Sequence, residues 1–310
     1  MFGSTFLRTP DLFPARHSGE SWGREAVVLD LPGGPYRFSG LSTEQTAAVR
    51  HRFGGLCQED GPSKVQGRLF RVAAEDFLEI DARGWEYGVD LDFAPDAVCM
   101  AGLRLMGRLD WRPGLAGALW TSEDGELFAG IFENFFRALV AYRLLEQGGV
   151  VVHSAGLVRN GGAFLFLGRS GAGKTTVSRL GLVHGATVLS DDLNALQPAA
   201  DGSDSAELEK LPFTGDLGES GAPAARYPLR ALFRLEKSEE DRLIPLSRAE
   251  AVACLLACSP FLNVDPYRRD DLIANLLHLL APGFALRFSL DGGFWSILAG
   301  KWPGSMEIAS

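Results

Sequence analysis

The sequence has 310 residues, which favours about two domains and is long enough to bury a large core without disulfide or metal staples. Apolar residues make up 46% and charged residues 22%, as in ordinary globular proteins. The formal net charge is −9, from 30 basic and 39 acidic residues. This balance argues against a general nucleic-acid binder or a protein that docks on anionic membranes, because both need a positive field.

Cysteine usage and hydropathy bear on the compartment. The four cysteines form no Cys-x-x-Cys pair and stand at Cys57, Cys99, Cys254 and Cys258. Cys254 and Cys258 are four residues apart in an apolar helical run, which favours small core residues over metal ligands and fits a reducing compartment. Residues 1–20 lack the apolar run of a signal peptide, and charged residues interrupt the apolar segment 131–145. We therefore expect a cytoplasmic protein.

The N-terminal half has a mostly β pattern. We expect residues 1–20 to form a loosely attached arm, followed by strands over 26–31 and 36–39 around the turn 32–35. The segment 65–120 is rich in β-forming residues and is broken by glycine, proline and aspartate, so it predicts four or five further strands.

Two helices are predicted in the same half. The segment 42–45 places a capping serine or threonine before acidic or amide partners, and it predicts a helix that runs to about Phe53. Apolar residues then recur every three or four positions over 126–147, which predicts a long helix that ends at Gly148. The recurring residues are Phe128, Ile131, Phe132, Phe135, Leu139, Tyr142 and Leu145.

A different pattern begins after this helix. We predict strands over 150–158, 163–167 and 187–190, a helix over 174–183, and a polar surface loop over 199–210. Further strands are predicted near 231–235 and 284–289, and further helices near 248–257 and 269–280. The chain thus reads as a mixed α/β domain, 1–147, followed by an α/β domain, 148–310. The first domain shows little chemistry of its own, so we assign it by elimination to substrate or partner recognition.

The segment from Gly168 to Thr175 fits G-x-x-x-x-G-K-[ST], the Walker A pattern of a phosphate-binding loop (P-loop). Its glycines let backbone N–H groups turn toward phosphate oxygens, and the following helix adds the positive end of its dipole. Lys174 supplies a cation, and the Thr175 hydroxyl is placed to bind Mg²⁺. The residues predicted to bind ATP are Gly168, Ser170, Gly171, Ala172, Gly173, Lys174, Thr175 and Thr176.

Asp191 and Asp192 directly follow the predicted strand 187–190. Neighbouring residues at a strand end point in opposite directions, so one carboxylate can face Mg²⁺ while the other faces an acceptor. A solvated helix cap is the alternative interpretation of this pair. His153 lies on the strand that precedes the loop; it is either a hydrogen-bonded structural residue or a group near the transferred phosphate.

Three segments together, Val152–Gly156, Phe166–Thr175 and Val188–Asp192, resemble the catalytic domain of HPr kinase/phosphorylase in content and order. The resemblance covers about residues 148–195 and does not extend to the N-terminal half. It implies a P-loop fold of the phosphoenolpyruvate carboxykinase type rather than the common NTPase type.

The resemblance also implies roles for individual residues. Asp191 would act as the general base on an acceptor hydroxyl, and Asp192 and Thr175 would hold Mg²⁺. His153 would lie near the transferred phosphate, and Lys174 would neutralise charge on it. Positioning and charge neutralisation are the main requirements of phosphoryl transfer.

The chain departs from the family pattern at two places. Ser154 stands where the family usually has glycine, and the family's downstream glutamate signature is not recognisable. Asp216 is the nearest substitute as a metal-side acid, and a turn aspartate is an equal alternative. With the different N-terminal half, these departures make the HPr protein itself a poor candidate substrate.

We therefore expect an ATP-dependent kinase that transfers the γ-phosphate of Mg-ATP to a hydroxyl, on a serine of a protein or peptide or on a small molecule. Three alternatives remain open: a non-catalytic nucleotide-sensing or assembly protein, a simple ATPase, and a phosphorylase. The resemblance also allows a homo-oligomer. Neither a nucleic acid nor a membrane is expected as a partner.

Overall fold

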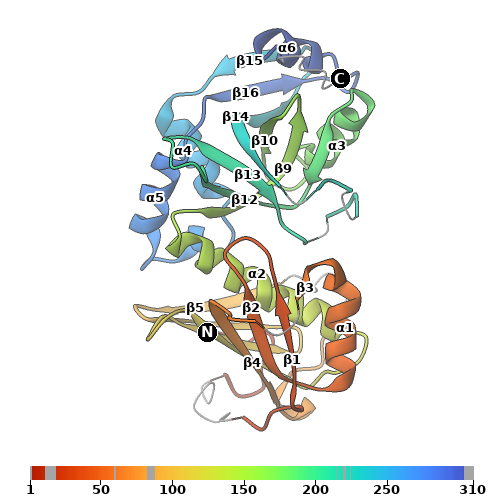
Figure 1. The fold of residues 1–310 in the computed structure, drawn as a ribbon, viewed down its shortest axis with the longest axis vertical. Helices are drawn as coiled ribbons and strands as arrows, with labels where there is room; N and C mark the ends of the chain where they lie inside the picture. The colour runs from red at the N-terminus through yellow and green to blue at the C-terminus, as the bar shows by residue number, and fades with distance from the viewer. Residues whose placement is uncertain are drawn as a thin grey trace. The chain divides into compact units, whose positions relative to one another are not determined.

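The computed structural model describes residues 2–10, 19–58, 61–81, 88–213, 215–218, 221–223 and 225–303. The chain separates into two compact units, unit 1 (Met1–Arg143) and unit 2 (Leu144–Ser310). Each unit is mixed α/β and, in its described part, contains one eight-stranded sheet (Figure 1). The division falls a few residues before the boundary at 147 that the sequence predicts. None of the helices among the described residues is long and apolar enough to cross a membrane.

Unit 1 has the strand order β3-β1-β2-β4-β8-β7-β6-β5. Strands β5 to β8 form an antiparallel meander, whereas β4 pairs in parallel with both β2 and β8. Five strands lie in the described part of 65–121, which confirms the predicted four or five. The strands are β1 (Glu25–Leu29), β2 (Tyr36–Leu41), β3 (Cys57–Gln58), β4 (Val65–Arg71), β5 (Val89–Ala94), β6 (Ala97–Gly102), β7 (Leu105–Asp110) and β8 (Ala116–Thr121).

Both predicted helices of this half are present, with the short 3₁₀ turns η2 (Gly54–Leu56) and η3 (Ala74–Asp76). Helix α1 (Thr43–Phe53) begins within the predicted segment 42–45, and the structure identifies Ser42 as the capping residue and Gln45 as its partner, each binding the other's backbone N–H. Helix α2 (Phe128–Glu146) buries its aromatic stripe on the sheet. There the rings of Phe38 and Phe132 pack edge to face, with their centroids 4.7 Å apart.

The expectation of a loosely attached N-terminal arm is wrong for residues 2–10. Phe6 and Leu7 are buried in a cluster with Phe77 and Trp120, and Leu7 forms a β-bridge to Phe77. Two adjacent apolar side chains bury enough area to fix a short segment without regular structure. The rest of the predicted arm, 11–18, lies outside the described residues.

Unit 2 has the strand order β10-β9-β12-β13-β14-β16-β15, with β11 paired to β9. Its strands are β9 (Val150–Arg159), β10 (Gly162–Leu167), β11 (Thr187–Ser190), β12 (Leu193–Pro198), β13 (Ala206–Lys210), β14 (Arg226–Lys237), β15 (Arg242–Pro245) and β16 (Gly283–Phe288). Its helices are α3 (Lys174–Val183), α4 (Arg248–Ala257), α5 (Arg269–His278) and α6 (Phe294–Lys301), with a 3₁₀ turn, η4 (Leu262–Val264).

Two long strands change partners along their length. Strand β9 pairs with β12 over Val150–His153 and with β10 over Ser154–Arg159. Strand β14 pairs successively with β13, β10 and β16. The pairings β10-β9-β12-β13-β14 and back to β10 therefore close a circuit, and the sheet curls on itself. The change of partner in β9 falls between His153 and Ser154.

Helices cover both faces of this sheet. Val177 of α3 and Trp295 of α6 share an apolar cluster with Phe166 and Phe233. The rings of Phe166 and Phe233 stack with their centroids 5.0 Å apart. On the other face, α4 approaches β16 so closely that a side chain at Gly283 would meet Ala251. Alternate residues of β14 thus face different helices, as a parallel strand buried on both sides requires.

The predicted loop over 199–210 is wrong in its second half, where β13 pairs with β12. The segment is acidic and therefore resembles a loop, but its residues alternate between buried and exposed as in a strand. Ala206 and Leu208 are buried, and the intervening Glu207 is partly exposed. Strands β12 and β15 and helix α6 were also not predicted. All three are short, and their apolar residues form no run long enough to show a period.

Candidate active site

The strand register places the two predicted motifs on either side of one position. Leu167, the last residue of β10, pairs with Ser154, so the P-loop begins beside His153. On the other edge of β9, β11 ends at Ser190 and β12 begins opposite His153. The turn that carries Asp191 and Asp192 lies between those two strands. His153 therefore stands between the phosphate-binding loop and the carboxylate pair.

The loop itself turns at two glycines. Gly171 and Gly173 adopt positive φ angles of 76° and 107°, and the N–H of Ala172 donates to Arg169 O at 3.0 Å. Helix α3 starts at Lys174 after Gly173, which supplies no side-chain cap. The first-turn N–H groups of a helix lack intrahelical acceptors and are available to an anion.

Gly173 is required by its conformation and by its neighbour, since a Cβ there would lie 2.7 Å from Phe288 Cζ. We expect Gly173→Ala to lower the free energy of unfolding by about 3 kcal/mol, from left-handed strain plus steric overlap. Gly185→Ala is the matched control, because φ is 76° and nothing lies within 4 Å; it should cost about 1 kcal/mol. Urea unfolding measures both, and equal losses would contradict the role given to Phe288.

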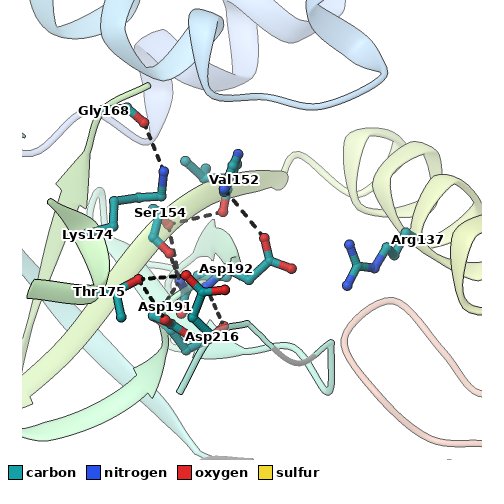
Figure 2. A network of polar contacts seen from close by, with 12 residues as sticks. Arg137, Val152, Ser154, Gly168, Lys174, Thr175, Asp191, Asp192 and Asp216 are labelled. Carbon is teal, nitrogen blue, oxygen red and sulfur yellow. Dashed lines mark hydrogen bonds and ion pairs between the residues drawn. The ribbon is translucent and has the colours of Figure 1, made fainter. Parts of the chain in front are cut away.

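Lys174 is nearly buried, with 8% of its surface exposed. Its Nζ donates to the carbonyl of Gly168 at 3.1 Å, which folds the side chain back over the loop (Figure 2). A buried ammonium needs compensating acceptors, and phosphate oxygens offer stronger ones than a single carbonyl.

The Thr175 hydroxyl lies between two carboxylates. Its Oγ1 is 3.2 Å from Asp191 Oδ2 and 3.3 Å from Asp216 Oδ2, and Figure 2 shows all three groups converging. Asp191 is 6% exposed, whereas Asp216 is exposed on the loop after β13. This loop can approach because residue 215 is glycine: a Cβ there would collide with the Asp191 carboxylate and lie 3.0 Å from Asp192 Cβ.

The second carboxylate of the pair points elsewhere. Asp192 Oδ1 lies 3.5 Å from His153 Nε2, and both side chains are partly exposed. Asp191 and Asp192 therefore face different sides, as the sequence predicts, but the division of contacts differs from the one that the resemblance implies. Asp191 is beside the P-loop hydroxyl, and Asp192 is beside the histidine.

Cys258, the residue after α4, also contacts the site. The N–H of His153 donates to the carbonyl of Cys258 at 2.7 Å. Burial raises the pKa of the Cys258 thiol, against the opposing effects of a hydrogen bond from the Gly168 N–H and of the Lys174 charge. The thiol is thus a neutral packing group at neutral pH. The sequence predicts a small core residue at Cys258, whereas the structure leaves this residue partly exposed, beside Gly168 of the P-loop.

The site offers oxygen donors that suit magnesium. Mg²⁺ prefers oxygen ligands and is commonly held by one or two carboxylates together with substrate phosphates. The hydroxyl of Thr175 and the carboxylates of Asp191 and Asp216 form such a set. Across the described residues, no group of three or more His, Cys, Asp or Glu side chains is arranged to hold a metal ion. The residues fit Mg²⁺ as a partner of a bound polyphosphate.

Sequence reasoning missed one buried residue at the centre of this site. Asn194 is fully buried on β12, and its amide donates to the carbonyl of Ser190, just before the carboxylate turn, and to the carbonyl of Ser154 on β9. An asparagine in an apolar strand is the signal that could have found it, because a polar group that is buried must be hydrogen-bonded.

The fold and the site thus define a mixed α/β protein with a Walker A loop facing a carboxylate pair. The sequence profile of the family described as SynChlorMet cassette protein ScmC matches residues 135–299, which is more than half of the chain. The chain belongs to this family. A search of curated proteins finds no match.

Proposed function

We propose that the protein is a kinase that transfers the γ-phosphate of Mg-ATP to a hydroxyl acceptor, in the first place a serine. The observation that carries the proposal is the meeting of the P-loop hydroxyl of Thr175 with the carboxylates of Asp191 and Asp216. A P-loop alone accounts for nucleotide binding. A second carboxylate, Asp192, directed away from the first supports transfer to an acceptor.

Within this proposal the two aspartates exchange the roles that the resemblance implies. Asp191, with Thr175 and Asp216, lies on the metal side of the γ-phosphate. Asp192 and His153 lie on the acceptor side. The distances support this division, because Asp191 approaches the Thr175 hydroxyl at 3.2 Å and Asp192 approaches His153 at 3.5 Å.

The proposed step balances as a simple displacement. The acceptor oxygen attacks Pγ and forms the new O–P bond, while the bond between Pγ and the β–γ bridging oxygen breaks and ADP leaves. The hydroxyl proton passes to the Asp192 carboxylate. Lys174 and the first-turn N–H groups of α3 stabilise the charge on the phosphate oxygens. Mg²⁺, when bound, adds charge neutralisation on the β- and γ-phosphates.

The direct test uses Mg-[γ-³²P]ATP and an array of serine-containing peptides. Each peptide has a matched copy in which alanine replaces serine, and Lys174→Met protein serves as the inactive control. We expect label on a subset of serine peptides, none on their alanine copies, and loss of the label with the variant.

Two other outcomes exclude the proposal, and a third would extend it. Steady phosphate release without labelled peptide indicates an ATPase. Tight ATP binding with neither release nor label, on the array or on small hydroxyl compounds, indicates a nucleotide-sensing protein. Release of pyrophosphate from phosphopeptide and inorganic phosphate would add phosphorylase activity to the same site.

A further inference from the structure

A buried polar network lies directly behind the two catalytic carboxylates. Asn194 Nδ2 donates to three oxygens: Ser154 O at 3.0 Å, Ser154 Oγ at 3.1 Å and Ser190 O at 3.3 Å. The side chains of Asn194 and Ser154 are fully buried. One amide thus joins the residue after His153 to the residue before Asp191.

The turn is fixed at each of its peptide groups. Asn194 holds the carbonyl of Ser190, and the Ser190 hydroxyl accepts from the N–H of Asp192 at 3.1 Å. The N–H of Ser154 donates to the carbonyl of Asp192 at 2.8 Å. Because these bonds fix the backbone on both sides of Asp191, they fix the directions in which both carboxylates leave the chain (Figure 2).

The network is not arranged for stability alone. Asn194 Oδ1 is buried and has no hydrogen-bond partner among the described residues. It faces Gly156, where an added Cβ would collide with it. Leaving a buried acceptor unsatisfied costs stability, so an apolar residue would serve the core better. The contribution of Asn194 to the site is therefore its amide nitrogen, which donates to three oxygens.

We propose that Asn194 and Ser154 are positioning residues, which hold Asp191 against Thr175 and Asp192 toward His153. This inference rests on the proposed function, since it gives the two carboxylates separate tasks. It also accounts for Ser154, where the resembled family has glycine. The serine hydroxyl accepts from Asn194 and donates to Val152 O at 3.0 Å, which a glycine cannot do.

The test compares Asn194→Ala and Ser154→Ala with wild-type protein. Asn275→Ala is the matched control, since its amide also bridges two carbonyls of unit 2, Leu145 O at 2.9 Å and Gly149 O at 3.2 Å. Calorimetry gives the affinity for the non-hydrolysable analogue AMP-PNP in EDTA and in MgCl₂. Hydrogen exchange at the Ser154 amide reports the network itself.

We expect Mg²⁺ to raise the wild-type affinity at least about tenfold, through the carboxylate that Asn194 holds. Asn194→Ala should keep its affinity in EDTA within about twofold and lose most of the Mg²⁺ gain, with faster exchange at Ser154. Ser154→Ala removes one hydrogen-bond acceptor of the Asn194 amide and should lose part of the Mg²⁺-dependent gain in affinity. If Asn194→Ala does not fold, Ser154→Ala still tests the inference. Asn275→Ala should keep the full gain.

Two results overturn the inference. If Asn194→Ala or Ser154→Ala keeps the full Mg²⁺ gain although exchange at Ser154 is faster, the network does not position Asp191. If affinity in EDTA falls as much as affinity in MgCl₂, the effect is on the fold. A wild-type protein that gains nothing from Mg²⁺ would instead refute the proposed function along with the positioning role, so the two failures are distinguishable.

Discussion

Replacing Lys174 by methionine is expected to weaken ATP binding by roughly 30- to 150-fold, which corresponds to about 2–3 kcal/mol. The substitution keeps the length and the apolar stem of the side chain but removes the ammonium, which is the only side-chain group of this residue that can bind phosphate. The lost free energy is that of a charge-assisted hydrogen bond to the nucleotide.

The fold should survive this substitution. In the absence of nucleotide, the hydrogen bond of the Lys174 ammonium goes to the carbonyl of Gly168, and methionine buries nearly the same area without a charge. We therefore expect the free energy of unfolding, measured in urea, to change by less than about 1 kcal/mol. A loss of stability larger than the loss of affinity would show that Lys174 supports the structure of the loop rather than the ligand.

Lys64→Met is the control for the removal of a lysine charge. Lys64 is exposed in unit 1, just before β4, and its backbone N–H bonds to Pro35 O. Its loss should leave ATP affinity within about twofold, since an exposed charge is screened by solvent and salt. Calorimetric titration with ATP measures both variants. If both variants lost ATP affinity equally, binding would depend on the net charge of the protein, which would contradict the P-loop assignment.

The site could be predicted from sequence where its geometry is local. The Walker A pattern fixes the loop, the helix N-terminus and the place of Lys174 within one short stretch, and α3 begins at that residue. Asp191 and Asp192 are also local, because β11 ends immediately before them. Such features depend on the backbone of a few neighbouring residues, which spacing alone determines.

The remaining features depend on long-range pairing. Which aspartate meets Thr175 follows from how β11 ends and from the approach of residues 215–218, and neither leaves a periodic signal. Asn194 acts across β9, β11 and β12, and β12 itself was not predicted. For Asp216, the sequence left a metal-side acid and a turn residue as equal alternatives. Its contact with Thr175 favours the first, and its role in metal binding stays a prediction.

The aspartate pair offers the sharpest test of the site, because Asp191→Asn and Asp192→Asn should fail in different ways. Both substitutions keep the shape of the side chain and remove one charge. For Asp191→Asn we expect the Mg²⁺-dependent gain in nucleotide affinity to fall by about tenfold or more, because a neutral amide is a poorer partner for the cation beside Thr175. Transfer should fall with it, as the nucleotide is no longer held in its reactive form.

Asp192→Asn should bind the magnesium nucleotide within about threefold of wild-type protein, since this carboxylate faces His153 rather than Thr175. Transfer to the most strongly labelled serine peptide should fall by about 10²- to 10⁴-fold, the usual contribution of a proton-accepting group. Calorimetry with AMP-PNP and label transfer separate the two measurements. If instead Asp191→Asn lost only transfer and Asp192→Asn lost the Mg²⁺ gain, the roles implied by the resemblance would hold and the geometric division would be wrong.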